Sequence, residues 1–202
     1  PLHVYGPERL KDVLDLQFSL SNTILPFEFT FHPITQAGLL LDSKHYTVEC
    51  FPTKHRIECW GFLVREKRNL RRINIEKVRT HRVPPIFFSK LQHGEDYISP
   101  DGETIKNELL TDENTKAKSY AFCADTIYDE TLVEIIKEVD LVYHETTYLS
   151  ALGDKATERF HSTTTQAATI ALNAKVHKLI IGHFSAKFES LEQFEKEARE
   201  VF

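Results

Sequence analysis

Acidic and histidine side chains stand at the ends of three short apolar segments of the chain. Asp125 follows an apolar stretch at 119–124, Glu145 follows Leu-Val-Tyr and His144, and His183 follows Leu-Ile-Ile-Gly. Imidazole and carboxylate groups are ligands for zinc, and a histidine paired with a carboxylate can move a proton. These residues therefore indicate a metal site combined with acid–base chemistry.

Two further histidines complete this set. His55, His183 and Asp125 supply what a zinc pair needs, namely neutral imidazoles and a carboxylate that can lie between two ions. His161 precedes Ser162 and Thr163, which open a predicted helix whose free N–H groups favour phosphate. A helix-capping role remains an alternative for Ser162, and also for Asp125 before the segment at 128–139.

The elements that must position these residues alternate between strands and helices. We predict strands at 119–124, 141–143 and 178–182, separated by helices at 128–139 and 163–174. Such crossovers are almost always right-handed, so the strands run parallel and their carboxyl ends meet at one edge of a sheet. We expect Asp125, Glu145 and His183 to meet there, together with His161.

The first part of the chain predicts further strands. Apolar alternation or β-type composition places strands at 2–5, 27–31, 46–51 and 57–65, with a helix over 10–18. The segment from Gly38 to Lys44 is expected to be a turn-rich connection. A charged amphipathic helix is predicted at 191–202.

A basic segment interrupts this pattern between residues 65 and 82. It carries eight cationic residues against two glutamates: Arg65, Lys67, Arg68, Arg71, Arg72, Lys77, Arg79 and Arg82. Prolines, an aromatic pair at Phe87-Phe88 and weak periodicity follow, up to about residue 118. We interpret 68–118 as an insertion whose basic and aromatic groups suit phosphate contacts and base stacking; a solvated surface arm is the alternative.

Composition limits the class of protein. The chain has 202 residues with 41% hydrophobic content, enough for one domain core, and it has no apolar run long enough to span a membrane and no secretory signal. Three scattered cysteines favour a reducing compartment, the cytoplasm. A net charge of −5 argues against a general nucleic-acid binder. Because the chain begins at Pro1 and contains no methionine, we expect it to be part of a longer protein.

Five segments together resemble a known family, the tRNA 3′-processing endonucleases called ribonuclease Z, which have the metallo-β-lactamase fold. The segments are Phe-Pro-Thr-Lys-His-Arg-Ile-Glu-Cys-Trp-Gly-Phe (51–62), Phe-Cys-Ala-Asp-Thr (122–126), His-Glu-Thr-Thr-Tyr (144–148), His-Ser-Thr-Thr-Thr-Gln-Ala-Ala (161–168) and Gly-His-Phe-Ser-Ala-Lys-Phe (182–188). The resemblance implies an α/β metallo-β-lactamase αββα sandwich as a single partial domain over 1–202, with a tRNA-binding arm inserted at about 68–118.

The resemblance also implies roles for individual residues. His55, Asp125 and His183 would be zinc ligands, with Asp125 bridging two Zn²⁺ ions, while Glu145 and His161 would protonate the leaving 3′ oxygen. Together with the basic segment and the helix start, it leads us to expect phosphate or RNA contacts at Ser162, Thr163, Ser185, Lys187, Arg68, Arg71 and Arg72.

Three departures from the family pattern are visible. The family's His-x-His-x-Asp-His motif is absent from the 202 residues, and we expect it upstream of Pro1, where the family carries it. The arm has Pro84-Pro85-Ile86 in place of a Gly-Pro-rich tip. Lys187 and Phe188 stand where the family tends to have Arg and Tyr.

The function implied is a zinc-dependent endoribonuclease that removes 3′ trailers from precursor tRNA, leaving a 3′-hydroxyl, and works as a homodimer. The alternatives are another phosphodiesterase or hydrolase of the same fold, and a non-catalytic tRNA-binding subunit.

Overall fold

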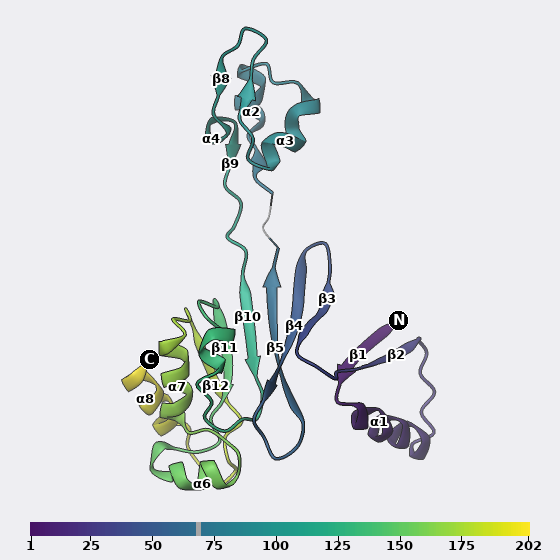
Figure 1. Cartoon of the computed structure of the whole chain (residues 1–202), viewed down its shortest axis with the longest axis vertical. Coiled ribbons are helices and arrows are strands. Elements are labelled where there is room, and N and C mark those ends of the chain that lie inside the picture. Colours follow the sequence, from purple (N-terminus) through teal and green to yellow (C-terminus); the bar gives the residue numbers. More distant parts are fainter. Residues whose placement is uncertain (68–69) are drawn as a thin grey trace. The chain divides into compact units, whose positions relative to one another are not determined.

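The computed structural model describes residues 1–67 and 70–202 (Figure 1). The chain divides into two compact units. The first contains Pro1–Arg65 and Lys118–Phe202, and the second contains Glu66–Ala117. Each unit has its own buried apolar cluster. None of the helices among the described residues is long and apolar enough to cross a membrane.

The chain begins with a small parallel β-pair joined through a helix. β1 (Leu2–Gly6) pairs with β2 (Phe29–Pro33) in the register Leu2↔Phe29, and α1 (Glu8–Leu20) lies between them in sequence. Pro7 sits immediately before the helix, where its missing N–H costs no hydrogen bond. The predicted helix at 10–18 and the strand at 2–5 are thus confirmed.

A six-stranded mixed sheet forms the centre of the first unit. Its strand order is β12-β11-β10-β5-β4-β3. The bounds are β3 (Gly38–Asp42), β4 (Tyr46–Thr53), β5 (Cys59–Glu66), β10 (Ser119–Cys123), β11 (Leu141–Glu145) and β12 (Leu179–Gly182). β10, β11 and β12 run parallel, which confirms the predicted crossover arrangement. β10 pairs antiparallel with β5, with Ser119 opposite Arg65.

The prediction of a turn-rich connection from Gly38 to Lys44 was wrong. These residues include β3, which pairs antiparallel with β4 through Leu39↔Glu49 and Leu41↔Val48. Three consecutive leucines with half-exposed side chains give no alternation, so sheet pairing with β4 rather than local pattern decides their conformation.

Helices cover the parallel part of the sheet. α7 (Thr164–Asn173) contacts β11 and β12, and α8 (Glu192–Val201) packs against α7 (Figure 1). Val142 on β11 and Ile170 and Ala171 on α7 belong to one buried cluster. The shorter helices are α5 (Leu132–Ile135), η2 (Ser150–Leu152) and α6 (Gly153–Glu158).

The predicted helix at 128–139 was wrong in length, because only α5 forms there. Before α5, the Asp129 carboxylate binds the Lys54 ammonium and the Thr131 backbone N–H, which holds that segment in a turn. After α5, Glu138 adopts a left-handed conformation (φ 56°) and donates its N–H to Ala174. Tertiary partners therefore replace the helical hydrogen bonds at both ends.

The second unit is built from short elements around its own core. Its core residues are Val78, Val83, Leu91, Tyr97, Ile105 and Leu110. The elements are β6 (Arg72–Ile73), α2 (Ile75–Thr80), η1 (Pro85–Phe87), α3 (Phe88–Gln92), β7 (Tyr97–Ile98), β8 (Thr104–Ile105), α4 (Asn107–Leu110) and β9 (Thr111–Asp112). β6 pairs with β9 and β7 with β8, both antiparallel.

Asn107 is the polar centre of this unit. Its side-chain N–H groups donate to the carbonyls of Leu91 and Glu95, both at 2.8 Å, and its side-chain carbonyl oxygen accepts from the Thr111 hydroxyl at 2.8 Å.

We expect Asn107→Ala to destabilise this unit by about 1–3 kcal/mol, because buried groups lose their partners. Amide hydrogen exchange at core positions such as Leu91 and Leu110, in the full chain, measures the change.

The matched control is Asn114→Ala, since Asn114 is exposed and, among the described residues, its side chain donates only to the Leu70 carbonyl. Its effect should stay within about 0.5 kcal/mol. Equal exchange rates in the two variants would show that the Asn107 network does not stabilise the unit.

Candidate active site

The parallel strands bring the acidic and histidine residues to one sheet edge. Asp125 lies two residues beyond β10, Glu145 is the last residue of β11, and His183 directly follows β12. Because the three strands are parallel and adjacent, their carboxyl ends lie together. Gly182 approaches Tyr143 so closely that a Cβ would lie 2.6 Å from the phenol oxygen, and His183 then turns with φ 60°.

His55 reaches this edge through the connection between β4 and β5. The Lys54 backbone N–H donates to the Thr126 hydroxyl (3.2 Å), and the Ile127 N–H donates to the Lys54 carbonyl (2.9 Å). The Lys54 ammonium also binds Asp129 at 2.9 Å. These three contacts fix the His55 segment against the loop that carries Asp125.

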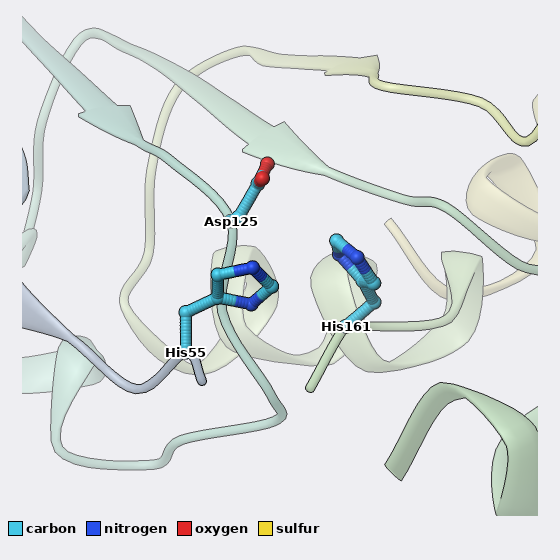
Figure 2. Close-up of side chains that lie close together, drawn as sticks. All are labelled: His55, Asp125 and His161. Carbon is cyan, nitrogen blue, oxygen red and sulfur yellow. The ribbon is translucent and has the colours of Figure 1, made fainter. Parts of the chain in front are cut away.

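The side chains of His55, Asp125 and His161 come from three separate loops and lie close together (Figure 2). Their possible ligand atoms all lie within 4.8 Å of one another. His55 Nδ1 is 2.9 Å from the Phe160 carbonyl, to which it can only donate, so in the neutral ring Nε2 keeps a lone pair. His183 Nε2 lies 3.4 Å from Asp125 Oδ1. The structure therefore brings all three predicted ligands together, with His161 beside them.

Glu145 and His161 form a direct pair. His161 Nδ1 lies 2.9 Å from Glu145 Oε1, with the carboxylate fully buried and the imidazole 15% exposed. The carboxylate also accepts backbone N–H groups of Thr126, Ser162 and Thr147. This pair has the geometry of an oriented acid–base histidine, because Glu145 holds Nδ1 while Nε2 remains for a substrate.

His144 does not belong to the site, although it precedes Glu145. It is 1% exposed and its Nδ1 donates to the Glu145 backbone carbonyl at 2.7 Å. Burial lowers the pKa of His144, which favours a neutral ring. His144 is therefore structural, and the histidine that pairs with the Glu145 carboxylate is His161.

Ser162 and Thr163 have structural partners. The Ser162 hydroxyl donates to the Thr126 carbonyl at 2.8 Å, and the Thr163 side chain caps α7 in a capping box with Gln166. Both residues are buried. Ser185 is half-buried, and its N–H donates to the Thr147 carbonyl. Phosphate binding by these three residues stays a prediction.

A cavity of about 760 Å³ opens over the site. His55, Asp125, His161 and His183 line it together with four cationic residues, Arg56, Lys155, Arg159 and Lys187, and one further carboxylate, Glu158. Within residues 1–67 and 70–202, none of the four cations forms an ion pair. The neighbouring Lys155 ammonium lowers the pKa of Lys187. Cationic side chains that form no ion pair, next to a cluster of possible metal ligands, suit the binding of a phosphodiester substrate.

Sequence reasoning identified Lys187 but missed Lys155 and Arg159. Lys155 lies in α6 and Arg159 directly follows it. Tyr148, also missed, lies under the Lys155 ammonium, which is 5.9 Å from the ring centroid. The only available signal was a pair of cations four residues apart just before His161.

The basic residues predicted in the insertion lie in the second unit or outside the described residues. Arg71 is 23% exposed, and its guanidinium donates to the Thr111 hydroxyl (2.7 Å) and approaches Glu113 (3.6 Å). Arg72 is exposed on β6. Arg68 lies outside the described residues.

Solved structures define the class of fold to which this chain belongs. Human tRNase Z, short form, aligns over 94% of this chain and 63% of its own, with TM-score 0.62 and 23% identity. The metallo-β-lactamase fold protein YhfI from Bacillus subtilis aligns over 100% of this chain and 59% of its own, with TM-score 0.58 and 17% identity. The chain therefore has the α/β metallo-β-lactamase fold.

Curated relatives define the family. No protein-family model matches the chain. Ribonuclease Z of Bacteroides thetaiotaomicron is 37% identical over 203 residues, covering all of this chain and 64% of the relative. Ribonuclease Z of Parabacteroides distasonis is 36% identical, covering all of this chain and 67% of the relative. The chain belongs to the ribonuclease Z family and spans about two thirds of the length of these relatives.

Proposed function

We propose that this chain carries the catalytic acid and part of the zinc site of an endoribonuclease that removes 3′ trailers from precursor tRNA, leaving a 3′-hydroxyl. The observation that carries the proposal is the Glu145–His161 pair at 2.9 Å in the same cavity as His55, Asp125 and His183. The ribonuclease Z relatives support the assignment to RNA cleavage.

The donor set fits zinc. The possible ligand atoms of His55, Asp125 and His161 lie within 4.8 Å of one another, and His183 Nε2 lies 3.4 Å from Asp125 Oδ1. In the neutral His55 ring, whose Nδ1 donates to the Phe160 carbonyl, Nε2 keeps the lone pair that a metal needs. His55, Asp125 and His183 would hold the metal. When bound, zinc supplies a Lewis acid that generates the attacking nucleophile from water. Proton transfer to the leaving group and binding of the phosphates are assigned to residues of this chain.

His161 is the group that delivers the proton. Its Nδ1 is held by Glu145, which keeps the ring oriented and supports the imidazolium, so Nε2 can protonate the leaving ribose 3′ oxygen. Lys155, Arg159 and Lys187 would bind phosphates that flank the scissile bond, since they line the same cavity and form no ion pair among the described residues.

Cleavage of precursor tRNA by the whole protein tests the proposal. A single cut after the tRNA part, giving a 3′-hydroxyl and a 5′-phosphorylated trailer, supports it. Cleavage of a chromogenic phosphodiester without cleavage of precursor tRNA would instead favour another hydrolase of the fold. Binding of tRNA without any cleavage would favour a non-catalytic subunit.

We also assign tRNA contacts to the second unit, as an arm. Arg72, Lys77, Arg79 and Arg82 are exposed and form no ion pair among the described residues. Lys77 and Arg79 lie in the last turn of α2. Arg71 is a poorer choice for a test, because Thr111 and Glu113 already hold its guanidinium.

The double substitution Lys77→Ala with Arg79→Ala is expected to weaken tRNA binding and to reduce the slope of log K against log salt by about 2, because each lost phosphate contact removes about one released counterion. Filter binding across a salt series measures it. The control, Arg9→Ala with Lys196→Ala, removes the same charge from exposed positions of the first unit. An equal slope change in both would exclude a specific arm contact.

Three further assignments complete the proposal: two Zn²⁺ ions per subunit, a homodimer and a cytoplasmic location. The three free cysteines fit a reducing compartment. Metal analysis and the mass of the whole protein in solution test the first two, and fractionation tests the third.

A further inference from the structure

Thr147 is a buried residue at the centre of the site that the mechanism above does not use. It lies two residues beyond the end of β11 and is 6% exposed. Its backbone N–H donates to Glu145 Oε2 at 2.9 Å, and its carbonyl accepts the Ser185 N–H at 3.1 Å. The main chain therefore fixes where its hydroxyl lies.

The hydroxyl touches two functional residues at once. Thr147 Oγ1 is 2.8 Å from Glu145 Oε2 and 2.8 Å from His183 Nδ1. A hydroxyl has one hydrogen to donate, so it donates to one of these groups and accepts from the other.

The Glu145 carboxylate determines to which of the two groups the Thr147 hydroxyl donates its hydrogen. Its other oxygen, Oε1, receives two backbone N–H groups and His161 Nδ1, and Oε2 already receives the Thr147 N–H. A carboxylate in such a set of donors is an acceptor, so the Thr147 hydrogen points to Oε2. The hydroxyl oxygen must then accept the Nδ1–H of His183.

The consequence for His183 is a defined tautomer. With its hydrogen on Nδ1, the neutral ring presents the Nε2 lone pair to Asp125 Oδ1, 3.4 Å away. Two lone-pair groups at this distance repel unless a proton or a metal cation lies between them. The ring is also carried on a left-handed backbone position (φ 60°), which a non-glycine residue adopts only when its surroundings hold it there.

We propose that Thr147 is a positioning residue that sets the tautomer and direction of His183 for metal binding and links it to Glu145. One buried carboxylate then orients both the proton donor, His161, through Oε1 and the metal ligand, His183, through Oε2 and the Thr147 hydroxyl. The metal-binding part of this inference rests on the proposed function, whereas the tautomer does not.

The first test is the tautomer of His183 in the metal-free chain, read from long-range ¹H–¹⁵N correlations of the imidazole. We expect the Nδ1–H form in the wild type and in Thr147→Ser, which keeps the hydroxyl. Thr147→Val keeps the shape but removes the hydroxyl, so the Nε2–H form should become populated. An Nε2–H ring in the wild type, or an unchanged spectrum in Thr147→Val, would overturn the proposal.

The second readout is zinc affinity, measured by competition with a chelator. Loss of a group that orients a metal-bound histidine weakens binding by about 10–100-fold, which is the effect expected for Thr147→Val, with Thr147→Ser restoring the wild-type value. The control is Thr146→Val, because this neighbouring buried hydroxyl donates to the Gly182 carbonyl and not to His183. Equal losses in Thr146→Val and Thr147→Val would contradict the specific role. Absence of zinc binding by the wild-type protein would count against the proposed metal site, while the tautomer measurement would still decide the role of Thr147.

Discussion

Replacement of His161 by alanine is expected to slow cleavage of precursor tRNA by about 10²–10⁴-fold, the range typical of a lost general acid. The imidazole is the group that Glu145 orients, and no other side chain offers a proton donor held by a buried carboxylate in this cavity among the described residues. Single-turnover cleavage by the whole protein, with tRNA affinity and zinc content measured in parallel, separates the proton step from binding.

The zinc content of the His161→Ala variant distinguishes a role of His161 as the acid from a role as a metal ligand. Its possible ligand atoms lie within 4.8 Å of those of His55 and Asp125, so it stands near enough to hold a metal. Retained zinc content with lost cleavage supports the acid role, whereas loss of zinc in His161→Ala would make it a ligand. His177→Ala, an exposed histidine outside the cavity, is the matched control and should cleave at the wild-type rate.

Asp125→Asn is expected to weaken zinc binding by at least about 100-fold and to abolish measurable cleavage. Removing a residue that merely orients a ligand costs about 10–100-fold, and loss of a charged ligand should cost more. Asparagine keeps the size of the side chain but not its charge, so the change isolates electrostatics at the centre of the His55, His161 and His183 cluster. Chelator competition measures the affinity, and dialysis of the wild type against a chelator should give the same loss of cleavage, reversed by added zinc.

Asp154→Asn supplies the control for charge alone, since Asp154 is exposed on α6 and does not line the cavity. It should leave zinc affinity unchanged. Wild-type zinc affinity in Asp125→Asn would show that this carboxylate is not a ligand, and the proposed metal site would have to be abandoned.

The sequence was most informative where local pattern and function coincide. Strands β10, β11 and β12 are short apolar runs that each end near a polar residue, so both their parallel order and the meeting of Asp125, Glu145 and His183 could be predicted. His161 could be added because it precedes a helix with a capping box, which marks the start of α7 in the sequence.

What could not be predicted depends on tertiary contacts. Thr147 is one of two adjacent threonines, with Thr146, just beyond β11, and nothing in the sequence singles out the hydroxyl that contacts His183. Lys155 lines the cavity from α6, which follows the loop after β11 and the 3-10 helix η2. The long helix predicted at 128–139 was prevented by Asp129 binding Lys54, a partner far away in sequence.

Strands β5 and β10 are antiparallel neighbours, and Arg65 pairs with Ser119. In the topology of the sheet, residues 66–118 are therefore the connection of one antiparallel hairpin. The entropy of closing a connection rises only with the logarithm of its length, by about 0.6 kcal/mol per doubling, so the sheet tolerates a long segment there. A two-residue turn could join the same two strands. The junction is thus a position at which the inserted segment could be exchanged or removed by recombination while the strands that carry Asp125, Glu145 and His183 stay in place.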